Sequence, residues 1–555
     1  MNPAIVFEPD GYLLTGPKLM GRQSAGAGFL RAAVQGRGAQ PVTAYTPSAN
    51  SAEVFRRTVA DIDPAAATEW IAGDRLDLLA GIGLLYRPDQ VLGPMARQRL
   101  RVGPAAYSLC GVTHTLATSW TLDAIAKILV DPVMPWDALI CTSKAALTVV
   151  EAVLDREAEH QRWRTRQDVA SERPLLPVIP LGVHTDDFAF TAQERQASRA
   201  AVGLNDTDVA VLFAGRLSIA GKAHPYPMLL ALQDVARETG RSIVLLLAGQ
   251  AFNAATGSLF ETAVATFCPD VRPVFVDGKD FAAYRGAWAA ADLFISLADS
   301  IQETFGLTPL EAMAAGLPAL VSDWNGYKDT VRDGVDGFRI PTWAPAPGAA
   351  EVVTRYFEAG VGGYDDYLYR SNTAVAVDMG ELRARLSDLV LDEALRRRMG
   401  AAGQARARST FDWRVVYRSY QDLWGVQTEI RRKAAADPAT QAWLSHAPAS
   451  SADHMGPFDT FASYPTRHVT ATTIVSRAPG ATPGAYRALI ADPLLSLWRV
   501  APELAGRVLQ ALEAGPLTVE ELAAATGVTL PQMTEVAARL AKIDLLILAT
   551  APNAA

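Results

Sequence analysis

The chain has 555 residues, half of them hydrophobic and a fifth charged, with a formal net charge of -8. A globular chain of this length is too long for one hydrophobic core, so we expect two or three domains. Nucleic-acid binding needs clustered Lys and Arg, and the negative charge argues against a nucleic-acid partner while leaving room for a local basic cleft.

The amino-terminal segment and the cysteines predict a cytoplasmic protein. Met1–Phe7 is a short apolar run with no basic region of a signal peptide, and no apolar stretch approaches the roughly 20 residues that span a bilayer. We therefore expect no transmembrane segment, and any membrane contact would be peripheral. The cysteines follow no disulfide or metal-ligand spacing, which favours small buried side chains in a reducing compartment. They are Cys110, Cys141 and Cys268.

Residues 1–190 alternate short β-rich apolar runs with longer helical patterns. This alternation predicts parallel βαβ units, with helices on both faces of one sheet, in a Rossmann-like domain. The expected strands are Ala4–Phe7, Pro41–Thr46, Ala105–Cys110, Ala138–Ser143 and Leu176–Pro180.

The same signal restarts after a hinge that Pro and Gly mark at Ile179–Val183, and it predicts a second Rossmann-like domain over residues 191–412. Helices are expected at Tyr226–Arg237 and Phe281–Ala291. The expected strands are Val209–Ala214, Ile243–Ala248, Pro273–Val276, Leu293–Leu297 and Ala319–Ser322.

The remaining chain is predicted to contain a helix, a linker and a small module. Glu381–Ser409 is strongly helical, and residues 413–433 form an amphipathic helix that returns to the first domain. Residues 434–477 are rich in Ala, Ser, Pro and His with weak periodicity, which predicts a linker. Residues 478–555 recover helical patterning.

This last segment resembles a small winged-helix module. Thr518 and Glu521 have capping-box spacing, Gly527 is expected to end their helix, and a second helix is expected to begin near Thr529. The second helix has few basic side chains that could reach bases or phosphates, which argues against DNA binding. The module could recruit a polypeptide by strand addition or pair two subunits into a homodimer. A packing domain that only stabilises the chain is an equal alternative.

The most informative motif is Glu303–Glu311, which reads ETFGLTPLE and continues into the run EAMAAGLP. Its two glutamates, separated by seven residues, with Phe305 and Gly306 between them, resemble the donor site of retaining glycosyltransferases of family 4. The resemblance covers about residues 4–433 and leaves the tail outside. Further matching pieces are Ala214–Leu217 with Lys222, Cys141–Lys144, Ile179–Val183 with Phe188, and Asp333–Gly337.

The resemblance implies the α/β fold known as GT-B, in which two Rossmann-like doubly wound domains face a cleft. By this resemblance the first domain binds the acceptor and the second domain binds a nucleotide sugar. Glu303 would contact the donor sugar, and Glu311 would bind the ribose hydroxyls. The backbone amides of Phe305, Gly306, Leu307 and Thr308 would hold sugar hydroxyls and phosphate.

The chemistry of the motif supports the same site. Gly306 stands between a predicted strand and a predicted helix, where the missing side chain lets backbone approach an anion at the helix N-terminus. Arg216 and Lys222 would offset the negative charge that grows on a departing diphosphate, in place of a metal. An alternative is that Thr308 and Glu311 form a capping box and only close a helix end.

Two features of the first domain are candidate site residues. The glycine-rich segment Gly21–Gly28 is expected to open a helix at Phe29, and in the family the matching loop lies against the donor phosphates, which implies a binding role for Gly26 and Gly28. A flexible connector is the alternative. His114 resembles the histidine of the family's cleft and would position the sugar, and a structural histidine is the alternative.

The resulting hypothesis is a retaining glycosyltransferase of the hexosyltransferase type, with a nucleotide-diphosphate sugar as donor and a saccharide, lipid or polypeptide as acceptor. No cofactor and no metal are expected. A phosphorylase-like enzyme would need a pyridoxal-binding lysine motif that the chain lacks. A dinucleotide-dependent oxidoreductase would need a GxGxxG turn after the first strand. A non-catalytic nucleotide-sugar-binding protein stays open.

Overall fold

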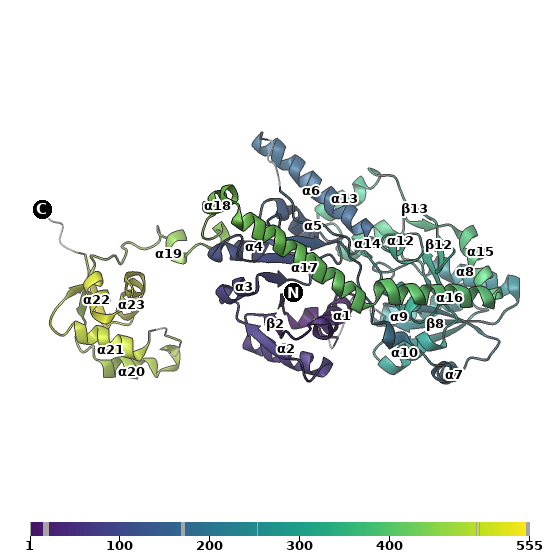
Figure 1. Cartoon of the computed structure of the whole chain (residues 1–555), viewed down its shortest axis with the longest axis horizontal. Coiled ribbons are helices and arrows are strands. Elements are labelled where there is room, and N and C mark those ends of the chain that lie inside the picture. The colour runs from purple at the N-terminus through teal and green to yellow at the C-terminus, as the bar shows by residue number, and fades with distance from the viewer. Residues whose placement is uncertain are drawn as a thin grey trace. The chain divides into compact units, whose positions relative to one another are not determined.

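The computed structural model describes residues 2–14, 21–167, 172–251, 253–495, 497, 498 and 500–550. The chain divides into two compact units, residues 1–451 and residues 452–555. Figure 1 shows the strands and helices of both units. None of the helices in the described ranges is long and apolar enough to cross a lipid bilayer.

The first domain is built on a parallel sheet in which the described strands follow the order β3-β2-β1-β4-β5-β6. Helices connect the strands in chain order. The strands are β1 Ala4–Val6, β2 Val42–Tyr45, β3 Thr68–Ile71, β4 Leu84–Tyr86, β5 Ser108–Val112 and β6 Ala138–Ile140. The helices are α1 Gly21–Gly36, α2 Ala49–Ile62, α3 Leu76–Ile82, α4 Gly93–Arg99, α5 Ser119–Ala126 and α6 Lys144–Thr165.

The second domain repeats this topology, because its sheet order β12-β11-β10-β7-β8-β9 is the same as that of the first when counted from its own first strand. Its strands are β7 Val209–Ala214, β8 Ile243–Gly249, β9 Arg272–Asp277, β10 Leu293–Ser296, β11 Ala319–Ser322 and β12 Gly337–Ile340. Its helices are α7 Ala192–Ala201, α8 Tyr226–Thr239, α9 Ala254–Phe267, α10 Phe281–Ala290, α11 Leu307–Ala314, α12 Tyr327–Thr330, α15 Met379–Leu391 and α16 Glu393–Arg406. The predicted fold class, GT-B with two doubly wound domains, is confirmed.

Burial on both faces of the sheet explains why the strands of the second domain are continuous apolar runs. Every residue of β7 is buried. Leu212 packs into a hydrophobic cluster on one face, and its neighbour Val211 packs into another cluster on the opposite face. Alternate side chains of a parallel strand therefore both face a core, as expected for a sheet covered by helices on each side.

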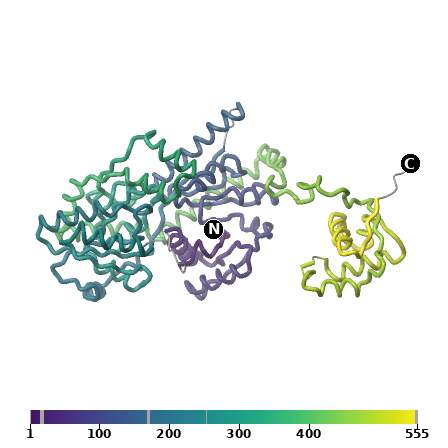
Figure 2. The backbone as a smooth tube through the Cα atoms, turned by 180° about the vertical axis from the view of Figure 1, so that it is seen from behind, coloured from purple at the N-terminus to yellow at the C-terminus, as the bar shows by residue number. Residues whose placement is uncertain are grey.

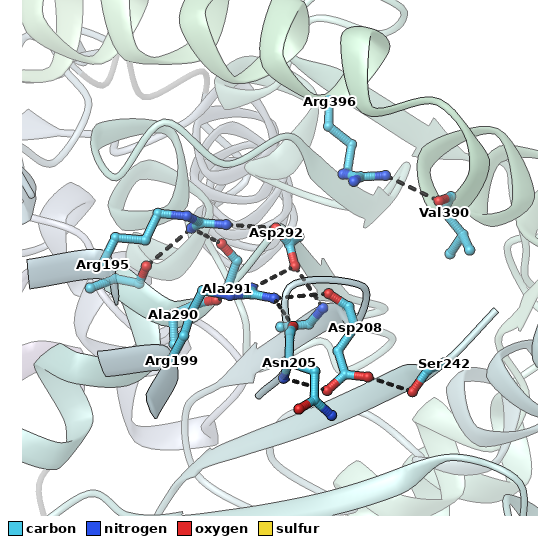
Figure 3. A network of polar contacts seen from close by, with 12 residues as sticks. Arg195, Arg199, Asn205, Asp208, Ser242, Ala290, Ala291, Asp292, Val390 and Arg396 are labelled. Atoms are coloured by element: carbon cyan, nitrogen blue, oxygen red, sulfur yellow. Dashed lines mark hydrogen bonds and ion pairs between the residues drawn. The ribbon is translucent and has the colours of Figure 1, made fainter. Parts of the chain in front are cut away.

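An ion-pair network fastens α7 to the second sheet (Figure 3). Arg195 and Arg199 of α7 both pair with Asp292, which directly precedes β10, at distances of 2.6 and 3.0 Å. Arg199 also donates to the carbonyls of Ala290 and Asp208. The network fixes the first helix of the second domain against the start of β10, at the amino-terminal ends of the strands. The candidate site lies at the opposite, carboxyl-terminal ends.

Two segments connect the domains, and they are hydrogen-bonded to each other. The amide of Val183 donates to the carbonyl of Phe411, and the amide of Trp413 donates to the carbonyl of Val183. The second segment continues into α17, Trp413–Ala436, which lies beside α1 on the first domain (Figure 1). Helix α17 therefore packs on the first domain although it follows the second domain in the chain.

Some elements differ from the sequence analysis. The edge strand β3 was not predicted, because only Ile71 of its residues is buried. The three-residue strand β4 and the strand β12 were also missed. The segment predicted as a strand at Leu176–Pro180 forms only isolated bridges beside β6. The long predicted helix from Glu381 is broken at Asp392, whose side chain caps α16.

The carboxy-terminal unit has its own hydrophobic core, and its trace is clear in Figure 2. The capping box between Thr518 and Glu521 forms, and Gly527 ends that helix in the left-handed conformation. Within the residues predicted as a linker, β15 pairs with both β16 and β17. Helix α18, Pro438–Leu444, still belongs to the first unit. The elements of the second unit are α19 Pro457–Thr460, β15 Ile474–Arg477, α20 Pro483–Ile490, α21 Pro502–Ala511, β16 Leu517–Thr518, α22 Val519–Thr526, α23 Leu530–Lys542 and β17 Leu546–Ala549.

Candidate functional site

The candidate site lies where β7 and β10 end side by side in the second sheet. The chain winds away from these two neighbouring strands in opposite directions, which is the switch point where doubly wound sheets bind ligands. The loop after β7 carries Arg216 and Lys222, and the loop after β10 carries Glu303. The fold therefore brings together residues that lie far apart in the sequence.

Lys222 and Glu303 form a direct ion pair across the two loops. The Lys222 Nζ donates to Glu303 Oε2 at 2.6 Å, and only 11% of the Glu303 side chain is exposed. The main chain of Glu303 is held as well, because Asn325 Nδ2 donates to its carbonyl at 2.7 Å. Arg216 is half-buried and makes no hydrogen bond or ion pair with any residue that the structure describes. The site thus presents one paired and one unpaired cation.

Gly306 allows the close turn from the β10 loop into α11. Its φ of 84° lies in the region that side chains rarely adopt, and a Cβ there would lie 2.1 Å from Cε1 of Tyr327. Tyr327 is itself buried and shares a hydrogen bond of 2.9 Å with Ser296 Oγ. No side chain caps α11 at Gly306. The amides of Leu307 and Thr308 at the helix start therefore lack a side-chain acceptor.

Glu311 does not form the capping box that the sequence left as an alternative. The N-cap of α11 is Gly306, so Thr308 lies inside the first turn, and Glu311 Oε2 is buried without a partner among the described residues. Burial raises the pKa of Glu311 to about 7, and the charge of Lys222 lowers it in part. Glu311 therefore keeps an unused acceptor near the Lys222 cation.

Asp299 belongs to the site and was missed by the sequence analysis. It lies three residues beyond the end of β10, and 5% of it is exposed. Its Oδ2 accepts from the amide of His224 at 3.1 Å, while its Oδ1 has no partner among the described residues. Burial raises the pKa of Asp299 to about 7. Its place shortly after a switch-point strand is the signal that could have identified it.

His114 is held in the first domain by main-chain and side-chain contacts. Its Nε2 lies 2.9 Å from the carbonyl of Pro88, and its amide donates to Gln90 Oε1. Burial lowers the pKa of His114 to about 4, so the ring is neutral at pH 7. A neutral ring beside a carbonyl carries its proton on Nε2, which leaves Nδ1 as an acceptor. These contacts are compatible with a role of His114 in positioning a sugar and with a purely structural role.

Gly26 and Gly28 lie inside α1, whose described part begins at Gly21 and not at the predicted Phe29. The amides at these positions follow the first turn and bond within the helix, so they are not free for a phosphate. A Cβ on Gly26 would lie 2.0 Å from the carbonyl oxygen of Gly11, and one on Gly28 would lie 2.5 Å from Nε1 of Trp413. Close packing accounts for both glycines.

Two hydrogen bonds connect the first domain directly to the site. Ser143, the N-cap of α6, donates from Oγ to the carbonyl of Thr304 at 2.8 Å. The amide of Lys144 donates to Asp329 Oδ2 at 2.7 Å. The first pair joins two segments that the sequence analysis singled out, and both pairs place the start of α6 beside the Glu303 loop and α12.

Comparison with known families locates a similarity in the second domain. Residues 194–359 match the family model described as glycosyl transferases group 1. The D-inositol 3-phosphate glycosyltransferase of Nocardia farcinica is 29% identical over 209 residues, which are 36% of this chain and 45% of that protein. The enzyme of the same name from Saccharomonospora viridis is 32% identical over 208 residues, or 34% of this chain and 47% of that protein. The chain thus spans about half the length of these relatives.

Solved structures with a similar chain trace include two sugar-related proteins. Sucrose-phosphate synthase from Thermosynechococcus elongatus aligns with a TM-score of 0.49 and 16% identity, over 79% of this chain and 100% of that chain. HepE from Anabaena in complex with UDP and glucose aligns with a TM-score of 0.49 and 15% identity, over 77% of this chain and 100% of that chain.

Proposed function

We propose that the chain is a glycosyltransferase that transfers a sugar from a nucleotide-diphosphate donor bound at the switch point of the second domain. The observation that carries the proposal is a group of charged side chains, two of them with unused hydrogen-bonding capacity, beyond the carboxyl ends of β7 and β10. Arg216 has no partner in the described chain, Lys222 is paired with Glu303, and Glu311 keeps a buried oxygen without a donor. The match to glycosyl transferases group 1 covers the same domain.

The donor would lie with its diphosphate near Arg216, Lys222 and the start of α11. A guanidinium can form two parallel bonds to phosphate oxygens, and the free amides of α11 add donors and a positive helix dipole. These groups are in place before the reaction, so they can stabilise the charge that develops on the leaving diphosphate without reorganising. Metal-independent transfer follows from this arrangement.

The two glutamates would bind opposite ends of the donor. Glu303 lies on the loop with the cations and would contact the sugar, and Glu311 lies one helical turn farther along α11 and would accept the ribose hydroxyls. A carboxylate has acceptor sites for two such donors. Glu311 must be ionised for this role, and the Lys222 charge favours its ionised form.

The resemblance to family 4 implies retention of the anomeric configuration. The acceptor hydroxyl would attack from the face that the diphosphate leaves. The bond from the anomeric carbon to the acceptor oxygen forms as the bond to the phosphate oxygen breaks, and the acceptor proton passes to that phosphate oxygen. The first domain would bring a saccharide, lipid or polypeptide acceptor to this face, with His114 as a positioning residue.

The first experiment is a thermal-shift panel of UDP, GDP, ADP and NAD on the full chain, followed by transfer or hydrolysis assays with sugars of the nucleotide that binds. A ligand at about 100 times its Kd should stabilise the folded chain by about 2.7 kcal/mol. We expect one nucleotide to do so with and without a chelator. Binding without any turnover would favour a non-catalytic sugar-nucleotide-binding protein, and a shift with NAD alone would favour an oxidoreductase.

A further inference from the structure

A helical insert between β12 and α15 touches the candidate donor site and has no role in the function proposed above. It contains β13 Thr342–Trp343, α13 Glu351–Glu358, α14 Tyr364–Asn372 and β14 Ala376–Val377. Its two ends are joined because β13 pairs with β14 in antiparallel fashion. Phe357 of α13 stacks on Tyr367 of α14 with ring centroids 4.4 Å apart. The insert is therefore a folded hairpin of helices.

Asn372, the last residue of α14, reaches from this insert into the loop after β7. It is 1% exposed, and its Nδ2 donates to the carbonyl of Ile219 at 2.7 Å and to that of Ala220 at 3.2 Å. Both protons of the amide nitrogen are thereby used. The two carbonyls lie between Arg216 and Lys222 in the sequence, so Asn372 holds the middle of the segment that carries both cations.

Asp299 holds the same loop from the end of β10. Asp299 Oδ2 accepts the amide proton of His224, two residues beyond Lys222. The loop is thus tied to buried polar groups both before and after Lys222, by α14 on one side and by the end of β10 on the other.

A second contact of the insert concerns Arg216. Burial raises the pKa of Tyr364, the first residue of α14, to about 12, and the positive charge of Arg216 offsets part of this rise. Tyr364 is therefore within electrostatic reach of Arg216. The two ends of α14 consequently face the two parts of the loop, Tyr364 near Arg216 and Asn372 at Ile219 and Ala220.

We propose that Asn372 is a positioning residue that fixes the loop of Arg216 and Lys222 in the conformation that meets the donor diphosphate. The proposal rests on the proposed function. A loop segment without side-chain ties samples many conformations, and each conformation that misplaces a cation by about 1 Å can cost about 100-fold in rate. Two hydrogen bonds to consecutive carbonyls restrict the segment without occupying either cation.

The test compares Asn372→Ala with Gln404→Ala in the full chain. Gln404 is the matched control, because its Nε2 also donates to a main-chain carbonyl, that of Ala314, at the opposite end of α11 from Gly306. Hydrogen exchange of the segment 216–224 is measured first, since it does not depend on activity. We expect Asn372→Ala to speed exchange of this segment at least tenfold relative to the rest of the domain, and Gln404→Ala to leave it unchanged.

The second measurement is the affinity for the nucleoside diphosphate that binds the wild-type chain, with kcat and KM where transfer is observed. We expect a loss of tenfold to 100-fold in kcat/KM for Asn372→Ala. Asn372→Ser, which keeps a small neutral polar side chain and cannot reach both carbonyls, should show the same exchange and affinity changes and serves if the alanine variant does not fold.

Unchanged exchange in segment 216–224, an increase spread evenly over the domain, or an equal increase in Gln404→Ala would overturn the role of Asn372. A wild-type chain that binds no nucleoside diphosphate and turns over no sugar nucleotide would instead overturn the proposed function. In that case the exchange data still decide whether Asn372 fixes the loop.

Discussion

The two Rossmann-like domains share one strand order and differ in what their switch points contain. In the first domain, the residues after β4 satisfy one another. Arg87 pairs with Asp89 at 2.6 Å, and the His114 ring is bonded to the carbonyl of Pro88. In the second domain, Arg216 lacks a partner within the described chain, and the buried oxygens Asp299 Oδ1 and Glu311 Oε2 lack donors there.

This contrast shows that the sheet provides the location and the loops provide the chemistry. A buried acceptor without a donor costs free energy of folding, commonly about 1–3 kcal/mol. Several buried acceptors without donors, close together beyond the carboxyl ends of two strands, are therefore expected where a ligand supplies the missing donors. In the first domain, Arg87, Asp89 and His114 already have partners within the chain and need no ligand to complete their hydrogen bonds.

The largest effect should come from the charged groups of the second domain. We expect Arg216→Ala, Lys222→Ala and Glu303→Gln each to reduce sugar transfer on the order of 100-fold or more, because each removes a group that acts on the donor. The control is Arg87→Ala in the first domain. Its guanidinium pairs with Asp89 in the first domain and takes no part in the proposed donor site, so nucleotide affinity should stay within about twofold of wild type. Equal losses of nucleotide affinity in Arg87→Ala and Arg216→Ala would break the contrast between the domains.

Alanine variants of one glycine from each domain should distinguish a packing role from a role in nucleotide binding. Both Gly306→Ala and Gly26→Ala place a Cβ within about 2 Å of another atom, so both should lower the melting temperature, in line with a strain of roughly 1–3 kcal/mol. Gly306→Ala should also weaken diphosphate binding about tenfold, because it moves the start of α11. Titration of the nucleotide in both variants measures this. A loss of affinity in Gly26→Ala equal to that in Gly306→Ala would restore a phosphate role for the first-domain glycines.

The smallest expected effect is a pH dependence at Glu311. Its pKa of about 7 means that the carboxylate forms as the pH rises through neutrality, so donor affinity should rise about tenfold from about pH 6 to about pH 8. Stability has the opposite sign. The folded chain binds a proton at Glu311 more tightly than the unfolded chain, so the free energy of unfolding falls as the pH rises between the unfolded and folded pKa values.

The control for this effect is Glu311→Gln, which cannot titrate at this position. The variant should lose the part of the pH dependence of donor affinity and of the free energy of unfolding that comes from Glu311, and keep the part that comes from Asp299 and the nucleotide. Affinity and urea denaturation are measured for wild type and variant across the same pH range. Parallel pH curves for the two proteins would contradict the assignment of Glu311 as a ligand of the donor.

The sequence predicts β7 and β11 to the residue, because buried parallel strands are continuous apolar runs with clear ends. It predicts neither β3, whose middle residues are exposed, nor the hairpin of α13 and α14, which follows a strand that was itself missed. Short or half-exposed elements obtain their structure from neighbours that lie far away in the chain, and periodicity carries no trace of those neighbours.

The site shows the same limit. Their motifs predict that Lys222 and Glu303 bind the same ligand, and the structure adds a direct hydrogen bond between the two side chains. Asp299 and Asn372 carry no motif. Their importance lies in contacts across many residues, such as that of Asn372 with Ile219, and in acceptors left without donors. Such features appear only after the chain is folded, because a single sequence does not reveal which distant residues meet.

The mutual bonding of the two connecting segments determines how the domains can move. Because Val183 is hydrogen-bonded to both Phe411 and Trp413, the two connecting segments form one short paired connection. Sliding the domains apart would break both hydrogen bonds, at about 0.5–1.5 kcal/mol each, whereas rotation about the paired segments leaves them intact. Trp413 also packs against Gly28 and Gly182, which holds the first-domain end of the connection in place. The connection therefore favours rotation of one domain against the other over sliding.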